Sequence, residues 1–327
     1  SKQLVIPVKR TLIIAGVGNF GLRWLEALWR IENNAVFVCL DTKERVRDLS
    51  EASVIDKLNQ TKKNKILLIS KKKDLPTSAD LIVVASTADV RAKLVHSLAS
   101  RVTAKEWILE KALAQSQEGL DLIQEALERQ KVFVNHSRPK QPVFEIVEEL
   151  VKQKGGISQI TLIGGKYELA SNAAHFIHQV MVITNQKLVS VEPKFADHWH
   201  KSSTRVGFLD VSGLLIARYE NGVEFTMDWS NETSAKSCWK LSCKSGSIEY
   251  NEDTGDLYVD GSHRRNIPLL NFSELFPERT PPGDTFSAAE ALPELKDVID
   301  VHIMLTAAFL SHYQTTMDKK AMRIPYS

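Results

Sequence analysis

Short hydrophobic runs alternate with amphipathic stretches along the first 135 residues. The runs have no polar face, which is typical of strands covered by helices on both sides. They lie at residues 11–18, 35–41, 65–70, 79–86, 106–111 and 131–136. Between them, residues 22–31, 89–100 and 119–130 repeat their apolar positions at the helical period of about 3.6 residues. This alternation predicts an α/β fold with a doubly wound parallel sheet of Rossmann type over residues 1–135.

The second part of the chain has a different pattern. Residues 142–155 have helical periodicity, whereas residues 212–230 and 239–261 alternate apolar and polar positions around the turn sequences ENG and DTG. Such alternation is typical of an antiparallel sheet with one buried face. We therefore expect an α+β domain at 136–327 with a large, mostly antiparallel open sheet, and a last helix at about 292–314.

Composition limits the partners of the protein. The 327 residues include 43% hydrophobic and 25% charged positions, enough for two cores. The net charge of +2 gives no electrostatic basis for binding nucleic acid or an anionic membrane. No run resembles a signal peptide or a membrane span, so we expect a soluble, cytoplasmic protein. Three scattered cysteines predict neither a disulfide framework nor a metal site.

The first strand-to-helix turn has the spacing of a dinucleotide-binding motif. It reads GVGNFG, with Asn19 and Phe20 between the last two glycines. Gly16 permits a tight turn, Gly18 lets the backbone approach a pyrophosphate, and Gly21 lets the helix pack on the strand. We take these five residues as cofactor-binding.

Asp41 ends the second hydrophobic run. A carboxylate there can accept hydrogen bonds from ribose hydroxyls and would repel a 2′-phosphate, so it favours NAD. Lys43 and Arg45 follow closely and leave NADP open. The alternative is that the glycines serve only a turn and Asp41 caps the next helix.

Ligands of doubly wound sheets bind at the carboxyl ends of the strands. Ser86 and Thr87 lie at the end of the fourth strand, and Glu110 and Lys111 at the end of the fifth, so we expect all four beside the cofactor. A lysine ammonium there could bind a substrate hydroxyl and stabilise negative charge on oxygen as hydride moves. The alternative for Glu110 and Lys111 is a solvated surface pair.

At these residues the sequence resembles the Gfo/Idh/MocA sugar oxidoreductases, and the resemblance spans essentially the whole chain. LEKALA is similar to the family segment E-K-P-L-A, with Ala112 in place of proline. ASTADVR is similar to A-T-P-x-x-x-H, with Thr87 and Arg91 in place of proline and histidine. The resemblance implies that Lys111 contacts both nicotinamide and substrate and that Glu110 positions it.

A second family element lies in the segment SNAAHFIH. Asn172 and His175 match the variant N-x-x-H, while Ser171 stands where the family usually has aspartate. With the phenylalanine that follows, this segment resembles members that belong to surface-polysaccharide biosynthesis. The resemblance implies that His175 is the catalytic proton relay. His178 lies near the same helical face, and we expect it and Asn172 in the substrate site, although a structural role for His178 is the alternative.

Two further clusters are candidates for the sugar site. His136 and Arg138 follow the sixth strand, where relatives place polar residues that face substrate. Trp199 and Arg205 lie in the segment DHWHKSSTRVG and could stack on a pyranose and bind its polar groups. The alternative for this segment is a surface loop with one anchored tryptophan.

These observations predict an oxidoreductase that passes hydride between NAD, or NADP, and a secondary alcohol or ketone of a sugar or nucleotide-activated sugar. The departures at Ala112, Arg91 and Ser171 keep a non-turnover NAD-binding sensor or assembly protein open. A third alternative is transient NAD redox in elimination, epimerisation or glycoside cleavage. The resemblance also implies that the open sheet forms a subunit interface, as in a homodimer or homotetramer.

Overall fold

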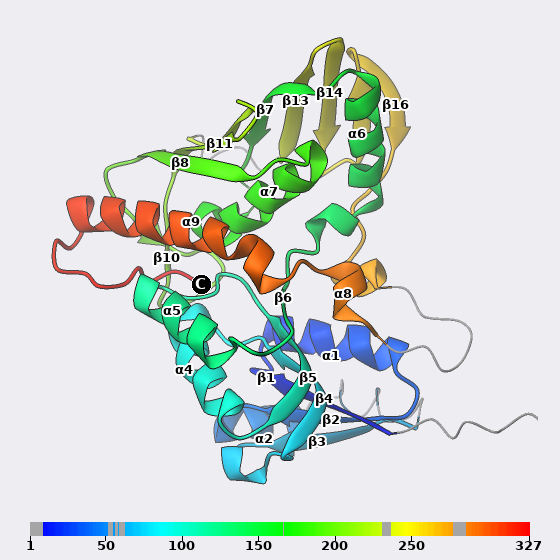
Figure 1. Cartoon of the computed structure of the whole chain (residues 1–327), viewed down its shortest axis with the longest axis vertical. Helices are drawn as coiled ribbons and strands as arrows, with labels where there is room; N and C mark the ends of the chain where they lie inside the picture. Colours follow the sequence, from blue (N-terminus) through cyan, green and yellow to red (C-terminus); the bar gives the residue numbers. More distant parts are fainter. Residues whose placement is uncertain are drawn as a thin grey trace, which may run out of the picture. The chain divides into compact units, whose positions relative to one another are not determined.

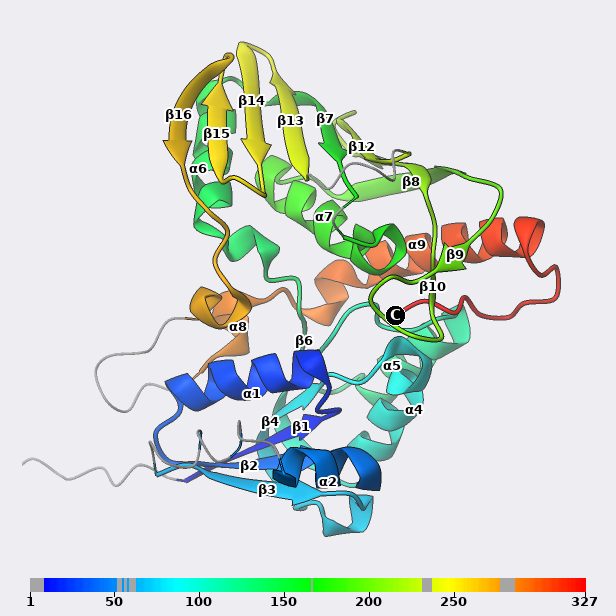
Figure 2. The same cartoon turned by 180° about the vertical axis from the view of Figure 1, so that it is seen from behind.

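The computed structural model describes residues 9–51, 55, 58, 63–165, 167–230, 237–276 and 286–327. The chain divides into two compact units, which are shown from opposite sides in Figures 1 and 2. Unit 1 comprises residues 1–110, 121–135 and 271–295. Unit 2 comprises residues 111–120, 136–270 and 296–327. The boundary expected after residue 135 is one of several points at which the chain passes between the units.

Unit 1 is built on a six-stranded parallel sheet with the order β3-β2-β1-β4-β5-β6. This is the order of a dinucleotide-binding fold, as predicted. The strands are β1 (Arg10–Ala15), β2 (Ala35–Leu40), β3 (Lys65–Ile69), β4 (Ser78–Val84), β5 (Thr103–Leu109) and β6 (Val132–Val134). The central strands are almost entirely buried, because helices cover both faces of the sheet.

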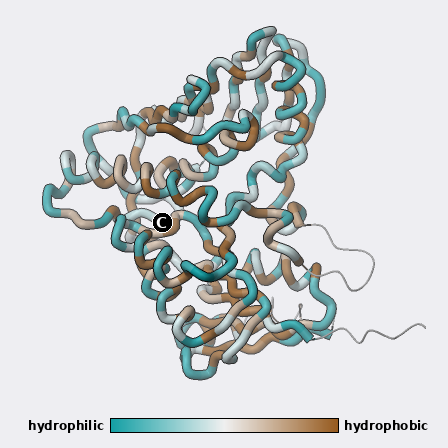
Figure 3. The backbone as a smooth tube through the Cα atoms, in the orientation of Figure 1, coloured by the Kyte–Doolittle hydropathy of each residue, from teal (hydrophilic) through white to brown (hydrophobic). Residues whose placement is uncertain are grey.

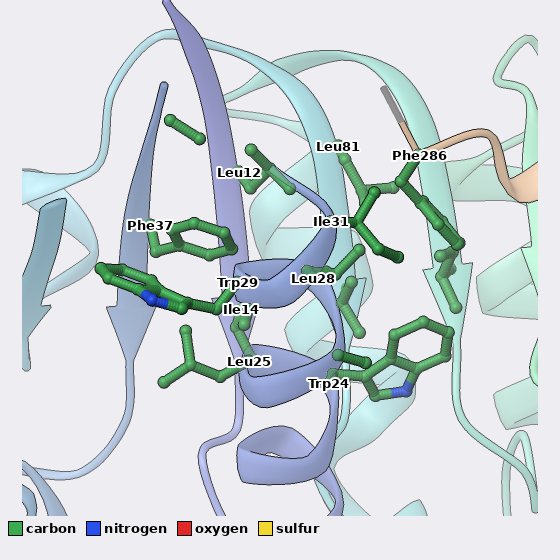
Figure 4. Packing of buried hydrophobic residues seen from close by; sticks show 14 of the residues in the cluster. Leu12, Ile14, Trp24, Leu25, Leu28, Trp29, Ile31, Phe37, Leu81 and Phe286 are labelled. Atoms are coloured by element: carbon green, nitrogen blue, oxygen red, sulfur yellow. The ribbon is translucent and has the colours of Figure 1, made fainter. Parts of the chain in front are cut away.

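The helices of this fold are α1 (Asn19–Ile31), α2 (Lys43–Glu51), α4 (Ala88–Ala99), α5 (Gln117–Ala126) and the short α8 (Ala288–Ala291). Figure 4 shows how α1 packs on the sheet: Leu25 and Leu28 lie against the side chains of Leu12 and Ile14 from β1. Burial of one such leucine stabilises the fold by about 1.5–3 kcal/mol. The helical spacing of apolar residues in α1 therefore has the structural role that the sequence predicts.

Three aromatic residues from late in the chain belong to the core of unit 1. The ring centroids of Phe272, Phe276 and Phe286 lie 4.8, 5.4 and 6.3 Å from that of Trp24. Arg30 in α1 also donates to the carbonyls of Ser273 and Phe276. These contacts explain why residues 271–295 belong to unit 1 although they follow the second sheet in sequence.

Unit 2 contains an eight-stranded sheet with the order β16-β15-β14-β13-β7-β12-β11-β8. Within it β7 and β12 pair in parallel, and the remaining neighbours are antiparallel, as predicted. The strands are β7 (Ile157–Ile163), β8 (Leu188–Phe195), β11 (Gly213–Tyr219), β12 (Glu224–Trp229), β13 (Cys238–Cys243), β14 (Gly246–Asn251), β15 (Asp256–Val259) and β16 (Ser262–Asn266). A small separate sheet pairs β9 (His200–Lys201) with β10 (Leu209–Asp210).

Three long helices accompany the large sheet: α6 (Pro142–Gln153), α7 (Leu169–Thr184) and α9 (Leu295–Thr316). Figures 1 and 2 show α7 beside α9, with α6 and α7 along one face of the sheet. In Figure 3 the hydrophobic stretches lie mostly inside each unit, and the outer loops are largely hydrophilic. None of the helices in the described part of the chain is long and apolar enough to cross a membrane.

Candidate functional site

The glycine-rich turn of unit 1 leaves room for a ligand at one residue. A Cβ atom on Gly16, whose φ is +89°, would lie 2.5 Å from the backbone nitrogen of Ser86, and one on Gly21 would lie 2.0 Å from the carbonyl oxygen of Gly16. A Cβ on Gly18 would meet nothing within 4 Å. Gly18 is the N-cap residue of α1, and no described side chain caps that helix. The open space beside Gly18, at a helix end that no described side chain caps, fits a pyrophosphate.

The side chain of Asp41 is hydrogen-bonded to the backbone of this turn. Its Oδ2 accepts a 2.6 Å hydrogen bond from the amide of Val17, and its Oδ1 accepts the amide of Thr42 at 2.7 Å. Arg45 donates from Nε to the Val17 carbonyl at 2.9 Å. Asp41 does not cap the helix that follows it. The side chain of Thr42 has that role, because its hydroxyl oxygen accepts a hydrogen bond from the amide of Arg45 at the start of α2.

The turn after β4 contains an unsatisfied hydroxyl. Ser86 Oγ is buried and has no hydrogen-bond partner, which is the environment of a group that awaits a ligand or water. Thr87, the N-cap residue of α4, is exposed. Arg91 is buried and donates to the Ser86 carbonyl, so the residue that departs from the family motif helps to hold this turn.

Glu110 and Lys111 are both buried, with 2% and 5% of their surface exposed, which excludes the solvated-pair alternative. Glu110 Oε1 accepts hydrogen bonds from Trp24 Nε1 at 2.7 Å and from Asn135 Nδ2 at 2.6 Å. These bonds stay within unit 1 and fix the carboxylate at the end of β5. Glu110 therefore fixes the backbone at the point where Lys111 follows in the chain.

Lys111 begins the part of unit 2 that follows β5. Its ammonium donates to the carbonyl of Ser171 at 2.7 Å and to Oδ1 of Asn172 at 3.1 Å. Asn172 in turn donates from Nδ2 to the carbonyl of Glu168 at 2.7 Å. The peptide bond from Lys111 to Ala112 is cis. The ammonium is thus held at the first turn of α7, and Ser171 contributes a backbone oxygen where the family usually has a carboxylate.

Four histidines gather in unit 2. The ring centroid of His136 lies 5.4 Å from that of His175, 5.0 Å from that of His178 and 5.2 Å from that of His302. The Nε2 atoms of His136 and His302 are 3.1 Å apart, a hydrogen-bonding distance. Among the described residues, no group of three or more His, Cys, Asp or Glu is arranged to hold a metal ion.

Burial lowers the pKa values of three of these imidazoles. Burial, followed by the charges of Lys111 and Arg138, holds the pKa of His175 well below its ordinary value of 6.5. Burial and the neighbouring histidines have the same effect on the pKa of His136, and burial lowers the pKa of His178 to about 4. A neutral His175 has a lone pair with which to accept a proton.

Arg138 is fixed from several sides. It forms an ion pair with Glu252, which is buried and also accepts Trp239 Nε1 at 2.8 Å. Its Nε donates to Oε1 of Gln179 at 3.1 Å, and its guanidinium lies 4.9 Å from the centre of the Phe176 ring. The structure therefore brings Arg138 to the helix that carries His175 and His178.

Trp199 and Arg205 lie on either side of β9 in unit 2. Trp199 is 4% exposed, donates to His312 Nδ1 at 3.1 Å and packs edge to face on Phe309. The loop that carries Arg205 is fastened to Glu168, which accepts the amide of Thr204 at 3.2 Å. The tryptophan is anchored by protein rings, and a contact between this loop and substrate stays a prediction.

Among the clustered residues, His302 is the one that the sequence reasoning missed. It lies in α9, far along the chain from the other three histidines, so no local spacing connects them. Only the packing of α9 in unit 2 brings its ring to His136. A histidine in a long amphipathic helix is ordinarily a core or surface residue, and nothing in the sequence marks this one.

Comparison with protein-family models gives no match, and neither does comparison with curated proteins. Several solved structures are similar over nearly the whole chain. An oxidoreductase from Agrobacterium radiobacter, in complex with NAD+, L-tartaric acid and magnesium, has a TM-score of 0.65 and 14% identity, and the match covers 93% of this chain and 96% of that one. An oxidoreductase domain protein from Kribbella flavida has a TM-score of 0.60 and 12% identity, with 97% and 99% covered.

The transcriptional regulator Gal80p from Kluyveromyces lactis is equally similar, with a TM-score of 0.66, 15% identity and coverage of 94% and 93%. At these identities the likeness establishes the fold. It is a parallel dinucleotide-binding sheet joined to a mostly antiparallel sheet, and both oxidoreductases and a transcriptional regulator have it.

Proposed function

We propose that the protein is a nicotinamide-dependent oxidoreductase that acts on a secondary alcohol or ketone. The observation that carries the proposal is the pairing of a buried ammonium, Lys111, with the neutral imidazole of His175 in one cluster of unit 2. The open space at Gly18 and the unsatisfied hydroxyl of Ser86 support cofactor binding by unit 1. The NAD+ complex of the Agrobacterium relative supports the same cofactor class.

The protein groups have separate tasks in this reaction. Bound NAD or NADP supplies the hydride acceptor or donor. His175 takes the hydroxyl proton during oxidation or returns it during reduction, because burial keeps its ring neutral. Lys111 stabilises the negative charge that develops on the substrate oxygen. Asn172 and the Ser171 carbonyl hold the ammonium in place.

The proposed substrate is a sugar or nucleotide-activated sugar from surface-polysaccharide biosynthesis. Support comes from the segment from Asn172 to Phe176, which resembles such enzymes, and from the array of hydrogen-bonding side chains around His136. His136, Arg138, Asn172 and His178 are the proposed substrate contacts, and Arg205 is a further one from the neighbouring loop.

A second candidate is a non-turnover NAD-binding regulator. The similarity to Gal80p favours it, as do the departures at Ala112, Arg91 and Ser171. Incubation with NAD and a panel of sugars separates the candidates. A dehydrogenase accumulates NADH absorbance, a transient-redox enzyme consumes substrate without it, and a regulator binds the cofactor and does neither.

Asp41 makes cofactor preference testable. We expect NAD(H) to bind more tightly than NADP(H), because the Asp41 carboxylate at the glycine turn repels a 2′-phosphate. Asp41→Ala should reduce the preference about tenfold, a change of about 1.4 kcal/mol. Fluorescence titration with both cofactors measures this, with the exposed Asp48→Ala as the matched control. Equal affinities for NAD(H) and NADP(H) in the unmodified protein would instead indicate that Arg45 binds the 2′-phosphate of NADP(H).

The large sheet makes oligomeric state testable. Ile163 and Leu214 share the face opposite the buried Leu215, by strand register and alternation, and both are partly exposed. We propose that this face forms the interface of a homodimer or homotetramer. Sedimentation at micromolar concentration should show a dimer or larger species, and Leu214→Glu should shift it toward monomer. A monomeric unmodified protein would contradict the proposal.

A further inference from the structure

The first turn of α7 is capped by a side chain from another element. The amides at the start of a helix have no partner within it. Asp210, the last residue of β10, accepts two of them: its Oδ1 accepts the amide of Ala170 at 2.7 Å, and its Oδ2 accepts that of Leu169 at 3.1 Å. Figure 2 shows β10 near the start of α7. A carboxylate here also suits the positive end of the helix dipole.

Asp210 is itself buried and held in place. It is 4% exposed, and its carboxylate accepts a third amide, that of Val211. Its strand pairs with β9, where His200 lies opposite Asp210. The amide of Leu209 donates to the carbonyl of Pro325 at 2.7 Å. The carboxylate is therefore fixed by its own surroundings and gives α7 a firm point of attachment.

The residue that would ordinarily cap α7 binds a different segment. Glu168 is the N-cap residue of this helix. Its carboxylate accepts the hydroxyl of Ser202 and the amide of Thr204, which both lie in the loop between β9 and β10. The cap of α7 therefore comes from Asp210, about forty residues further along the chain, a distance that no local capping motif spans.

The turn that Asp210 caps also carries two acceptors of Lys111. The ammonium donates to the carbonyl of Ser171 and to Oδ1 of Asn172. These are the third and fourth residues of α7, and the Asn172 side chain is held in turn by the carbonyl of Glu168. His175 lies one turn further along the helix. Fraying of the first turn would therefore move the Lys111 ammonium relative to His175.

We propose that Asp210 is a positioning residue for the reaction: its carboxylate fixes the first turn of α7 and, through that turn, the place of the Lys111 ammonium beside His175. The inference rests on the proposed function, which gives Lys111 and His175 their chemical roles. Asp210 acts through backbone amides and takes no part in the transfer of proton or hydride.

The charge of Asp210 suits this role at the pH of the experiments below. Burial raises the pKa of Asp210 to about 6, and the charge of Glu168 adds to the rise, while the three bound amides oppose it. At pH 8 the carboxyl group is therefore ionised, and both of its oxygens accept hydrogen bonds.

Hydrogen exchange at pH 8 tests the cap without turnover. Asp210→Ala removes the acceptors and should lower the protection of the amides at 169–172 about three- to tenfold, the effect of losing a helix cap. Asp210→Asn keeps one acceptor and should restore part of the protection. The control is Asp256→Ala, in β15, whose carboxylate accepts hydrogen bonds from His263 and Asn266. Unchanged protection in Asp210→Ala, or an equal loss in the control, would overturn the proposal.

Acetylation of lysine side chains tests the place of the ammonium, again without turnover. Lys111 is 5% exposed in the unmodified protein and should react slowly with acetic anhydride. In Asp210→Ala its rate should rise severalfold relative to Lys105, an exposed lysine of the same molecule that serves as the internal reference. Peptide mass spectrometry measures both rates. An unchanged ratio would overturn the proposal, and Asp210→Asn carries the same test if the alanine variant does not fold.

A double-mutant cycle separates positioning from a merely structural cap. At pH 8, Asp210→Ala should lower kcat about tenfold or more and change KM little, because the ammonium is misplaced in the transition state. In the Lys111→Met background the same substitution should have little further effect, because the group that it positions is gone. Asp210→Asn should recover part of the rate. An equal loss of kcat in both backgrounds would overturn the positioning role.

The inference and the proposed function fail separately. Lower protection and faster acetylation of Lys111 in Asp210→Ala, with no NADH formation by the unmodified protein, would support the placement of Lys111 by Asp210 and remove the oxidoreductase. NADH formation by the unmodified protein at a rate that Asp210→Ala retains would overturn the inference and leave the oxidoreductase standing.

Discussion

We expect Lys111→Met to lower turnover by about a hundredfold or more and to leave cofactor affinity nearly unchanged. The ammonium is held by the Ser171 carbonyl and Asn172, so it is oriented before substrate arrives. Its interaction strengthens as the substrate oxygen becomes alkoxide-like, and one such donor is worth about 3 kcal/mol in the transition state. Methionine keeps the apolar stem of the side chain and removes the charge.

Steady-state kinetics and cofactor titration together measure this effect. Lys105→Met is the matched control, because Lys105 is an exposed lysine on β5 that pairs with Asp80. The melting temperature of each variant shows whether the fold survives. If Lys111→Met turns over at a near-normal rate, Lys111 serves only a structural role at the first turn of α7.

We expect His175→Gln to lower turnover by about 10²–10⁴-fold and to change the pH profile. Burial and the charge of Lys111 hold the pKa of His175 well below 6.5, so the proposed base stays neutral in the unmodified protein at pH values where an ordinary histidine is protonated. Oxidation should therefore decline only at a pH below 6.5. Glutamine cannot titrate, so the variant should lose that decline along with most of its rate.

The two residues are also coupled. Lys111→Met removes a cation that lowers the pKa of His175, so the acid limb of the remaining activity should move to higher pH. The double variant should lose less than the product of the single losses, because both groups act on one transition state. Profiles of kcat/KM against pH measure these effects, with His263→Gln as control. An acid limb that persists in His175→Gln would assign the base to another residue.

The elements that sequence predicted best are those with local causes. The parallel sheet follows from all-apolar runs, and the glycine-rich turn follows from Gly16 and Gly21, where a Cβ atom would clash with the backbone. Lys111 and His175 were also assigned from local motifs, and the structure brings both into one cluster. Each of these features depends on residues that are near one another in the chain.

The features that sequence could not predict depend on tertiary packing. His302 reaches His136 only through the packing of α9, and Phe276 reaches Trp24 from far along the chain. The backbone carbonyl of Ser171 accepts a hydrogen bond from Lys111. This contact could not be predicted, because every residue has a backbone carbonyl and the sequence does not mark the one that is used. Trp199 is a residue type that often stacks on sugar rings, but in the structure its ring packs on Phe309.

The transfer of deuterium from NADH labelled at the transferable C4 position tests the central claim most directly. The protein is incubated with the labelled cofactor and a panel of keto sugars and their acidic analogues, and the products are analysed by mass spectrometry. The oxidoreductase account predicts that a product carbon acquires the label, and that Lys111→Met reduces the labelling about a hundredfold. Tight cofactor binding with no label in any product would contradict it and leave the regulator as the better account.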